Sequence, residues 1–234
     1  MMRFILIMAF AAIPAALCGQ SWNGQERSPD FGPQLSGEVF NFQLIARGSQ
    51  YHYADWLRGD VLLYSGQVST NHQLRYNGYR DAVVWLHPES MQEIRLDIRL
   101  VQGFTLYGPR QDTMVYERIR TSDGHFFAER LHKGKHNLFV YRKVEQTGEV
   151  IERAGNALHA RAILEARPAY YLIDRQGNDH RLRRINRRSL LGAFPEQRRE
   201  LRQLLRSHRA SIGNEAQLVR AVSLIDDWMK QQGL

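Results

Sequence analysis

The sequence predicts an α+β protein, in which a predominantly antiparallel β body is followed by a C-terminal α-helical unit. Short segments with strand character follow one another from residue 59 to residue 144, and turn-forming pairs separate them. No helix-like segment lies between them, which favours antiparallel hairpins over strand–helix–strand units. After residue 185 the apolar residues take the spacing of amphipathic helices. A meander, a sandwich and a barrel-like sheet are all compatible with this pattern.

The first nineteen residues have the layout of a secretory signal peptide. Arg3 precedes an apolar run from Phe4 to Leu17, which is shorter than the ~20 residues that a membrane-spanning helix needs. We therefore expect residues 1–19 to be a signal peptide and the protein to be exported, either periplasmic or secreted. The only cysteine, Cys18, lies in the expected cleavage region. Cleavage beside Cys18 and a lipid anchor on it are both open, and Leu17 favours cleavage because lipoprotein signals carry a small residue there.

Changes in composition divide the rest of the chain into three parts. Residues 20–37 contain scattered Gly, Pro and Ser without apolar periodicity, which indicates a flexible linker. Residues 38–184 hold the strand-like segments and form the predicted antiparallel β-rich domain. Residues 185–234 form the predicted helical unit, which we expect to pack on that domain. With a single cysteine the mature chain cannot form an internal disulfide, so its core alone must stabilise it.

Alternation within the β-rich domain is clearest in residues 93–100. There the four apolar residues lie on one face of a predicted half-buried strand, and they are Ile94, Leu96, Ile98 and Leu100. The pair Asn77-Gly78 lies between two strand-like stretches, which predicts a hairpin with a type I′ turn. The strands of this hairpin are 69–76 and 79–87, and the other predicted strands are 59–66, 103–107, 113–120, 125–132 and 136–144.

The segment 146–167 is compatible with a short helix or with an excursion from the sheet. A last hairpin, 170–174 with 180–183, follows it. A short helix is predicted at 187–193, and a second one has Pro195 at its first position and an apolar face formed by Leu201, Leu204, Leu205 and His208. Asn214 and Gln217 resemble a capping box that opens a third helix, whose apolar face is formed by Leu218, Ala221, Val222, Ile225 and Trp228.

Several short motifs resemble a family of uncharacterised exported proteins of Bacteroidota. These motifs are Gly59 to Gly66, Leu74 to Asn77 with Tyr79 and Asp81, Phe127 to Leu131, Leu138 to Tyr141, Tyr170 to Ile173 with Gly177, and Leu190-Leu191. The resemblance runs from residue 55 to residue 230, and the chain departs from it in carrying arginine where lysine is expected. It implies a location in the cell envelope, and it supplies no activity and no catalytic residues.

Arginine supplies 28 of the 32 basic residues, and the net charge is +8. Residues 181–210 contain ten arginines against only Glu196 and Glu200. Four of these arginines project within ~80° of one another on the predicted helix, which makes them candidates for binding an anionic lipid or glycan surface, and they are Arg198, Arg202, Arg206 and Arg209. The alternatives are a solvated helix face, packing against acidic residues of the sheet such as Glu93 and Asp97, and a codon bias towards arginine.

Two further readings of the polar residues are not favoured. A helix–turn–helix would bind DNA through its second helix, but here that helix carries Glu215, Asp226 and Asp227, which repel phosphate, so nucleic acid is not an expected partner. His132 and His136 flank a predicted turn, whereas metal sites need three or four ligands. We therefore expect scattered surface histidines, with no metal and no cofactor.

The sequence contains none of the common hydrolase motifs, neither Gly-x-Ser-x-Gly nor His-Glu-x-x-His. Carboxylate pairs such as Asp112 with Glu117, or Asp226 with Asp227, act together only if the fold joins them. The many strand aromatics are compatible with an exposed recognition face or with a sheet covered on both faces. We therefore favour a non-enzymatic envelope protein that acts as a binding or structural module for an envelope protein, a glycan or an anionic membrane. The alternative is an envelope hydrolase whose site is assembled from distant strands.

Overall fold

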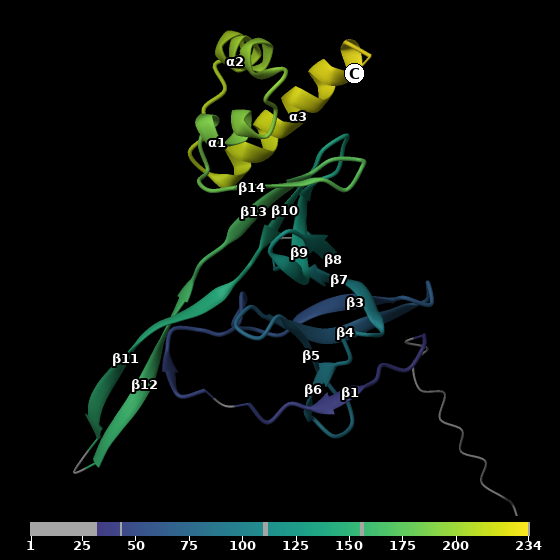
Figure 1. The fold of residues 1–234 in the computed structure, drawn as a ribbon. Coiled ribbons are helices and arrows are strands. Elements are labelled where there is room, and N and C mark those ends of the chain that lie inside the picture. Colours follow the sequence, from purple (N-terminus) through teal and green to yellow (C-terminus); the bar gives the residue numbers. More distant parts are fainter. Residues whose placement is uncertain (1–31, 43, 110–111, 155–156, 234) are drawn as a thin grey trace, which may run out of the picture. The chain divides into compact units, whose positions relative to one another are not determined.

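The computed structural model describes residues 32–42, 44–109, 112–154 and 157–233 (Figure 1). The predicted signal peptide, and residues 20–31 of the predicted linker, lie outside these ranges. Of the remaining linker residues, Leu35 is buried and Gly37 begins the first strand. Among the described residues, no helix is long and apolar enough to cross a membrane.

The described chain consists of strands followed by three helices. The strands are β1 (Gly37–Val39), β2 (Ala46–Arg47), β3 (Leu57–Leu63), β4 (Val68–Asn77), β5 (Ala82–Leu86), β6 (Glu93–Leu96), β7 (Val101–Tyr107), β8 (Thr113–Thr121), β9 (Gly124–His132), β10 (Asn137–Tyr141), β11 (Val144–Ala154), β12 (Ala157–Ala166), β13 (Ala169–Ile173) and β14 (Asp179–Leu182). The helices are α1 (Arg187–Gly192), α2 (Arg198–Ser207) and α3 (Glu215–Gln231).

The main sheet has 11 strands in the order β1-β6-β5-β4-β3-β7-β8-β9-β10-β13-β14, and neighbouring strands are antiparallel. The predicted α+β class with an antiparallel β body is therefore confirmed. The sheet is open, with β1 and β14 at its two edges, so the described strands do not form a closed barrel. Most of the order follows the chain because short turns join consecutive antiparallel strands.

Aromatic side chains fill the layers on the two faces of this sheet. Phe127 packs with Tyr76, Phe104 and Tyr116 in one buried cluster. Phe126, the preceding residue, packs with a different cluster that contains Phe139 and Tyr171. Successive residues of a strand point to opposite faces, so this division follows directly from the pleat.

The segment 146–167 belongs to the hairpin of β11 and β12 (Figure 1). These two long strands pair antiparallel, and β2 adds to β12 in parallel to make a separate three-stranded sheet. Of the two alternatives for this segment, the excursion from the sheet is therefore the one observed, and the short helix is absent from its described residues. A register shift between Gln146 and Gly148 marks an irregularity in the ladder.

The three helices pack against one end of the sheet. Leu190, Leu201 and Leu218, one from each helix, share a buried cluster with apolar residues of β10, β13 and β14. Asn186 caps α1, because its Oδ1 accepts the backbone N–H of Ser189 at 2.8 Å. Asn214 Oδ1 likewise accepts that of Gln217 at 2.9 Å, as predicted for α3.

The predicted strand 93–100 is too long. Strand β6 ends at Leu96, and the Asp97 side chain accepts the backbone N–H of Arg99 at 2.9 Å, which closes a turn. Ile98 and Leu100 are consequently 41% and 46% exposed instead of buried. The alternating sequence continues through the turn, although the strand does not.

The predicted type I′ turn at Asn77-Gly78 is also wrong. Asn77 is the last residue of β4, and its side chain accepts the backbone N–H groups of Tyr79 and Arg80 at 3.1 and 3.0 Å. This arrangement produces a longer turn, in which Asp81 has the positive φ of 48°. Gly78 is required for another reason, because a Cβ there would lie 2.2 Å from the carbonyl oxygen of Arg142.

Candidate functional site

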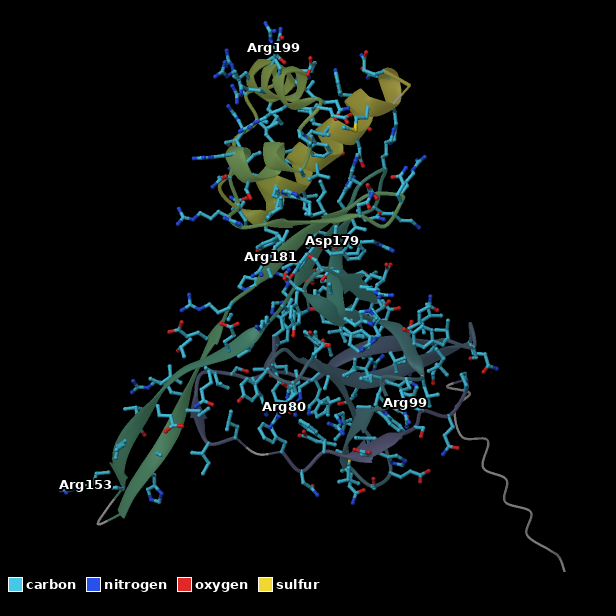
Figure 2. The ribbon with its side chains drawn as sticks, in the orientation of Figure 1. Arg80, Arg99, Arg153, Asp179, Arg181 and Arg199 are labelled. Carbon is cyan, nitrogen blue, oxygen red and sulfur yellow. The ribbon has the colours of Figure 1, made fainter. Side chains whose placement is uncertain are left out.

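Helix α2 has one apolar face and one arginine face. Leu201 and Leu205 are fully buried against the neighbouring elements. Arg198, Arg202 and Arg206 are exposed, and at 100° per residue they spread over ~80° of the helix. Arg199 is exposed beside them and projects away from α2 (Figure 2). We call these four residues, together with the exposed Arg209 that follows the helix, the arginine surface.

The first turn of α2 is electrostatically unfavourable for these side chains. Arg198 and Arg199 are the first two residues of the helix, where the positive end of the helix dipole disfavours cations. The cap residue, Gln197, makes no side-chain cap hydrogen bond. Like charges at i,i+4 positions, such as Arg202 and Arg206, each cost a few tenths of a kcal/mol more. Arg198 and Arg199 therefore lower the stability of the first turn, whereas Glu200 in the same turn and Arg206 in the last turn suit the dipole.

The sequence predicted that Arg209 lies on the helix, but α2 ends at Ser207 and Arg209 terminates it. Its φ is 49°, and its N–H bonds to the carbonyl of Arg206 while the N–H of Ala210 bonds to that of Leu205. These two bonds form a Schellman motif, in which glycine is the usual residue at the left-handed position. An arginine there costs stability because its Cβ crowds the neighbouring carbonyl. Pro195 likewise lies outside the helix, since α2 begins only at Arg198.

No ion pair engages the arginine surface within the described residues. The acidic residues that the sequence offered as alternative partners are taken by other arginines: Arg75 binds Glu93 at 2.7 Å, and Arg99 binds Asp97 at 2.7 Å. Packing against these carboxylates is therefore not the explanation for the arginine surface. Sequence reasoning also missed Arg199, which is exposed next to Arg198 but was not among the four predicted arginines.

A buried ion network connects the helical unit to the sheet. Arg142, at the end of β10, donates to Glu129 of β9 at 2.6 Å and to both carboxylate oxygens of Glu215 at 2.8 Å. Tyr170 donates its hydroxyl hydrogen to Glu215 at 3.0 Å. Burial raises the pKa of Glu129 more than the charge of Arg142 lowers it. In Glu215, burial also acts upwards, but the hydrogen bonds and charge of Arg142 outweigh it and lower the pKa.

His52 lies close to this network. Burial and, second, the positive charge of Arg142 lower the pKa of His52 to about 4, against a smaller opposing effect of Glu215. The imidazole is therefore neutral at pH 7. The hydrogen bonds of this network link the helical unit to the sheet, and they hold Glu215, the first residue of α3, in a fixed position on it.

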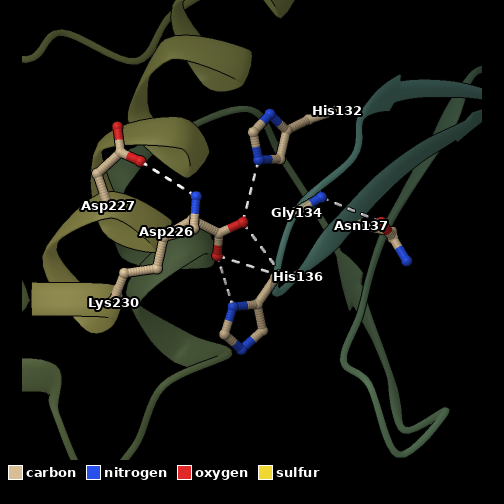
Figure 3. A network of polar contacts seen from close by, with 7 residues as sticks. All are labelled: His132, Gly134, His136, Asn137, Asp226, Asp227 and Lys230. Carbon is tan, nitrogen blue, oxygen red and sulfur yellow. Dashed lines mark hydrogen bonds and ion pairs between the residues drawn. The ribbon is translucent and has the colours of Figure 1, made fainter. Parts of the chain in front are cut away.

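The two histidines predicted to be scattered on the surface are instead bound to one buried carboxylate (Figure 3). Asp226 of α3 is 1% exposed, and it accepts from His132 Nε2 at 3.0 Å and from His136 Nδ1 at 2.8 Å. Burial would raise the pKa of Asp226, but the hydrogen bonds of His136 and His132 outweigh it and lower the pKa. Gly134 permits this contact, because a Cβ there would lie 1.9 Å from Asp226 Oδ2.

This histidine pair does not make a metal centre. Among the described residues, no group of three or more His, Cys, Asp or Glu side chains is placed to hold a metal ion. The neighbouring Asp227 is exposed and binds Lys230 at 3.4 Å, so the fold does not join Asp226 and Asp227 into the acid–base pair that the sequence left open. Sequence reasoning missed this contact because Asp226 lies 94 residues away from His132 and 90 from His136.

Two further sets of polar side chains in the described chain lack the geometry of a hydrolase site. Ser69 Oγ lies 2.7 Å from His72 Nε2, but the serine is fully buried and donates its hydroxyl hydrogen to the carbonyl oxygen of Pro33 at 2.6 Å. Its proton is therefore not held by the histidine, as a nucleophile would need. Glu117, which the sequence left open as an acid–base partner of Asp112, forms an ion pair with Arg130.

Exposed aromatic rings do not form a recognition face on the described part of the sheet. The exposed aromatic residues there are Tyr64, in the turn after β3, and Tyr107, at the end of β7, at 56% and 43%. Most of the other strand aromatics belong to the buried clusters. The sequence left open an exposed aromatic face or a sheet covered on both faces, and the described residues fit the covered sheet.

No family model, no curated protein and no solved structure matches this chain. The functional argument therefore rests on the chemistry of the described residues.

Proposed function

We propose that this chain is an exported, non-enzymatic binding protein of the cell envelope that attaches to an anionic lipid surface through the arginine surface of α2. The observation that carries the proposal is the exposed set of arginines without ion pairs in the described chain. Arginine presents a planar fork of donors that matches a phosphate bidentately, and phosphate groups are the main anions of membrane surfaces.

The stability cost of the arginine surface supports the same proposal. Arg198 and Arg199 oppose the helix dipole, and Arg209 occupies a backbone position that favours glycine. An anionic partner would offset these costs, because each basic residue near an anionic membrane contributes ~1 kcal/mol to binding. Solvation alone offers no such compensation for residues placed this way.

The test is sedimentation of the protein with vesicles that contain phosphatidylglycerol. The variant carries glutamine at the four positions predicted from the sequence, which are Arg198, Arg202, Arg206 and Arg209. Losing four contacts of ~1 kcal/mol each lowers the partition coefficient roughly a hundred- to a thousandfold. Glutamine keeps a polar, flexible side chain and removes the charge, and a urea unfolding curve confirms that the variant folds.

The matched control removes the same charge elsewhere. The control variant carries glutamine at four exposed positions outside α2 whose arginines make no ion pair among the described residues: Arg58, Arg120, Arg153 and Arg175. We expect this control to bind vesicles nearly as well as the native chain. Equal losses in both variants would reduce the effect to net charge, and unchanged binding in the α2 variant would disprove the proposal. Binding to an anionic polysaccharide but not to vesicles would assign the surface to a glycan instead.

A further inference from the structure

A pocket of about 940 Å³ lies where the main sheet meets the base of the β11–β12 hairpin. Its walls come from the turn before β5, the start of β9, the ends of β10 and β12, and parts of β13 and β14. None of its residues belongs to α2, so it is separate from the arginine surface. Its charged residues carry both signs, and they are Asp81, Asp123, Glu145, Lys143, Arg167 and Arg181.

One wall of the pocket is aromatic and held in place. The rings of Phe126 and Tyr141 stack with their centroids 4.2 Å apart and an interplanar angle of 14°, and the ring centroid of Tyr171 lies 5.4 Å from that of Phe126. The hydroxyl of Tyr171 donates to Asp123 at 2.7 Å. Tyr141 makes no hydrogen bond through its hydroxyl within the described part of the chain, and burial raises its pKa, so this phenol remains a donor. Such a preformed wall suits the apolar part of a small ligand.

Asp81 is the acidic residue of the pocket that makes no ion pair in the described chain, although the charge of Arg118 acts on it from farther away. Its Oδ1 accepts both the Tyr76 hydroxyl at 2.8 Å and the backbone N–H of Phe127 at 3.0 Å. No described group donates to Oδ2. The residue is held with a φ of 48°, a strained conformation that persists only when its surroundings enforce it. Burial raises the pKa of Asp81 more than its two hydrogen bonds and the charge of Arg118 lower it, so the carboxylate is only partly compensated. A ligand cation in direct contact with Oδ2 would offset the remaining cost of burying the charge.

The basic residues of the pocket are held more loosely. Arg181 pairs with Asp123 at 3.1 Å, and Lys143 pairs with Glu145 at 2.6 Å. The side chains of Arg181 and Lys143 are 56% and 43% exposed. Exposed pairs of this kind contribute little, typically below about 1 kcal/mol, so they exchange readily for another carboxylate.

We propose that this pocket binds a zwitterionic ligand of the amino-acid or short-peptide class. Its ammonium group lies on Oδ2 of Asp81, its carboxylate on the basic rim formed by Lys143, Arg167 and Arg181, and its apolar side chain against the rings of Phe126 and Tyr141. The aromatic faces also favour a neighbouring cation through their quadrupole. This proposal does not depend on lipid binding by α2.

The probe is the dipeptide alanyl-phenylalanine, titrated into the full chain and followed by NMR shifts of the pocket backbone amides. Two derivatives separate the charges: the N-acetyl form lacks the ammonium group, and the C-terminal amide lacks the carboxylate. We expect the parent dipeptide to bind and each derivative to bind at least tenfold more weakly. No shift of the pocket amides at about 10 mM dipeptide would contradict the proposal, because that concentration detects even millimolar affinity.

The decisive variant is Asp81→Asn. Asparagine keeps an oxygen acceptor for Tyr76 and Phe127, tolerates positive φ, and removes only the charge. We expect it to bind the dipeptide at least tenfold more weakly, while its weak binding of the N-acetyl form stays unchanged. The control is Asp227→Asn, which removes an exposed carboxylate of α3 outside the pocket. Equal dipeptide affinity in the Asp81→Asn variant and the native chain would overturn the assignment of the ammonium site.

Discussion

The ion network around Arg142 gives a sharp test of what holds the helical unit on the sheet. The substitution Arg142→Met removes the guanidinium and retains much of the side-chain volume. It leaves Glu129, whose side chain is only 10% exposed, and the half-buried Glu215 without their shared cation. Breaking a buried ion pair by removing one partner costs roughly 3–5 kcal/mol, because an uncompensated charge stays in the interior.

Urea unfolding at pH 7 measures this cost. With a slope of roughly 2–3 kcal/mol/M for a chain of this size, the midpoint falls by about 1–2 M. The control Lys230→Met breaks an exposed pair, in which both side chains are 61% exposed, and costs less than about 1 kcal/mol.

A second substitution checks the reason for the loss. Adding Glu129→Gln to Arg142→Met replaces the stranded carboxylate with a neutral amide, so part of the lost stability returns. A loss below 1 kcal/mol for Arg142→Met, or no recovery in the double variant, would refute the view that a buried uncompensated charge controls this tie.

Three further outcomes are expected from other parts of the chain. Gly134→Ala places a Cβ against Asp226 Oδ2 and separates α3 from the β9–β10 turn, so thermal unfolding shifts to lower temperature by several degrees. His52, with its pKa lowered to about 4, is protonated more readily in the unfolded chain, so stability falls between pH 6.5 and pH 4. This fall amounts to about 3 kcal/mol, and urea unfolding of His52→Gln at several pH values shows a correspondingly smaller decrease. Arg209→Gly raises stability by roughly 0.5–1 kcal/mol, because glycine suits the left-handed position, yet it weakens vesicle binding. An Arg209→Gly variant that is less stable, or that binds vesicles more tightly, would contradict the assignment of a functional cost to this residue.

Local patterns predicted much of the fold. Period-two alternation and turn pairs located most strands of the main sheet, and Asn214 with Gln217 marked the start of α3. The same local rules failed where a side chain redirected the backbone. Asp97 closes a turn inside an alternating sequence, and Asn77 caps a longer turn than the Asn-Gly pair indicates.

Contacts between distant segments were beyond the reach of these rules. Asp226 reads as a solvated helix residue until the fold brings two histidines from the β9–β10 turn to its carboxylate. Asp81 likewise gains its place in a pocket only from strands far along the chain. Helix periodicity, in contrast, placed Arg198, Arg202 and Arg206 on one exposed face, because a surface helix displays its charged face whatever it packs against, and it failed only for Arg209, which lies past the helix end.

The most direct test of the central claim uses the native chain and two vesicle compositions. The fraction that sediments with phosphatidylglycerol-containing vesicles is compared with the fraction that sediments with purely zwitterionic phosphatidylcholine vesicles, at low and at high salt. Attachment through the arginine surface predicts strong binding to the anionic vesicles at low salt, loss of that binding at high salt, and little binding to the zwitterionic ones. Equal binding to both vesicle types, or anionic binding that is indifferent to salt, would contradict it.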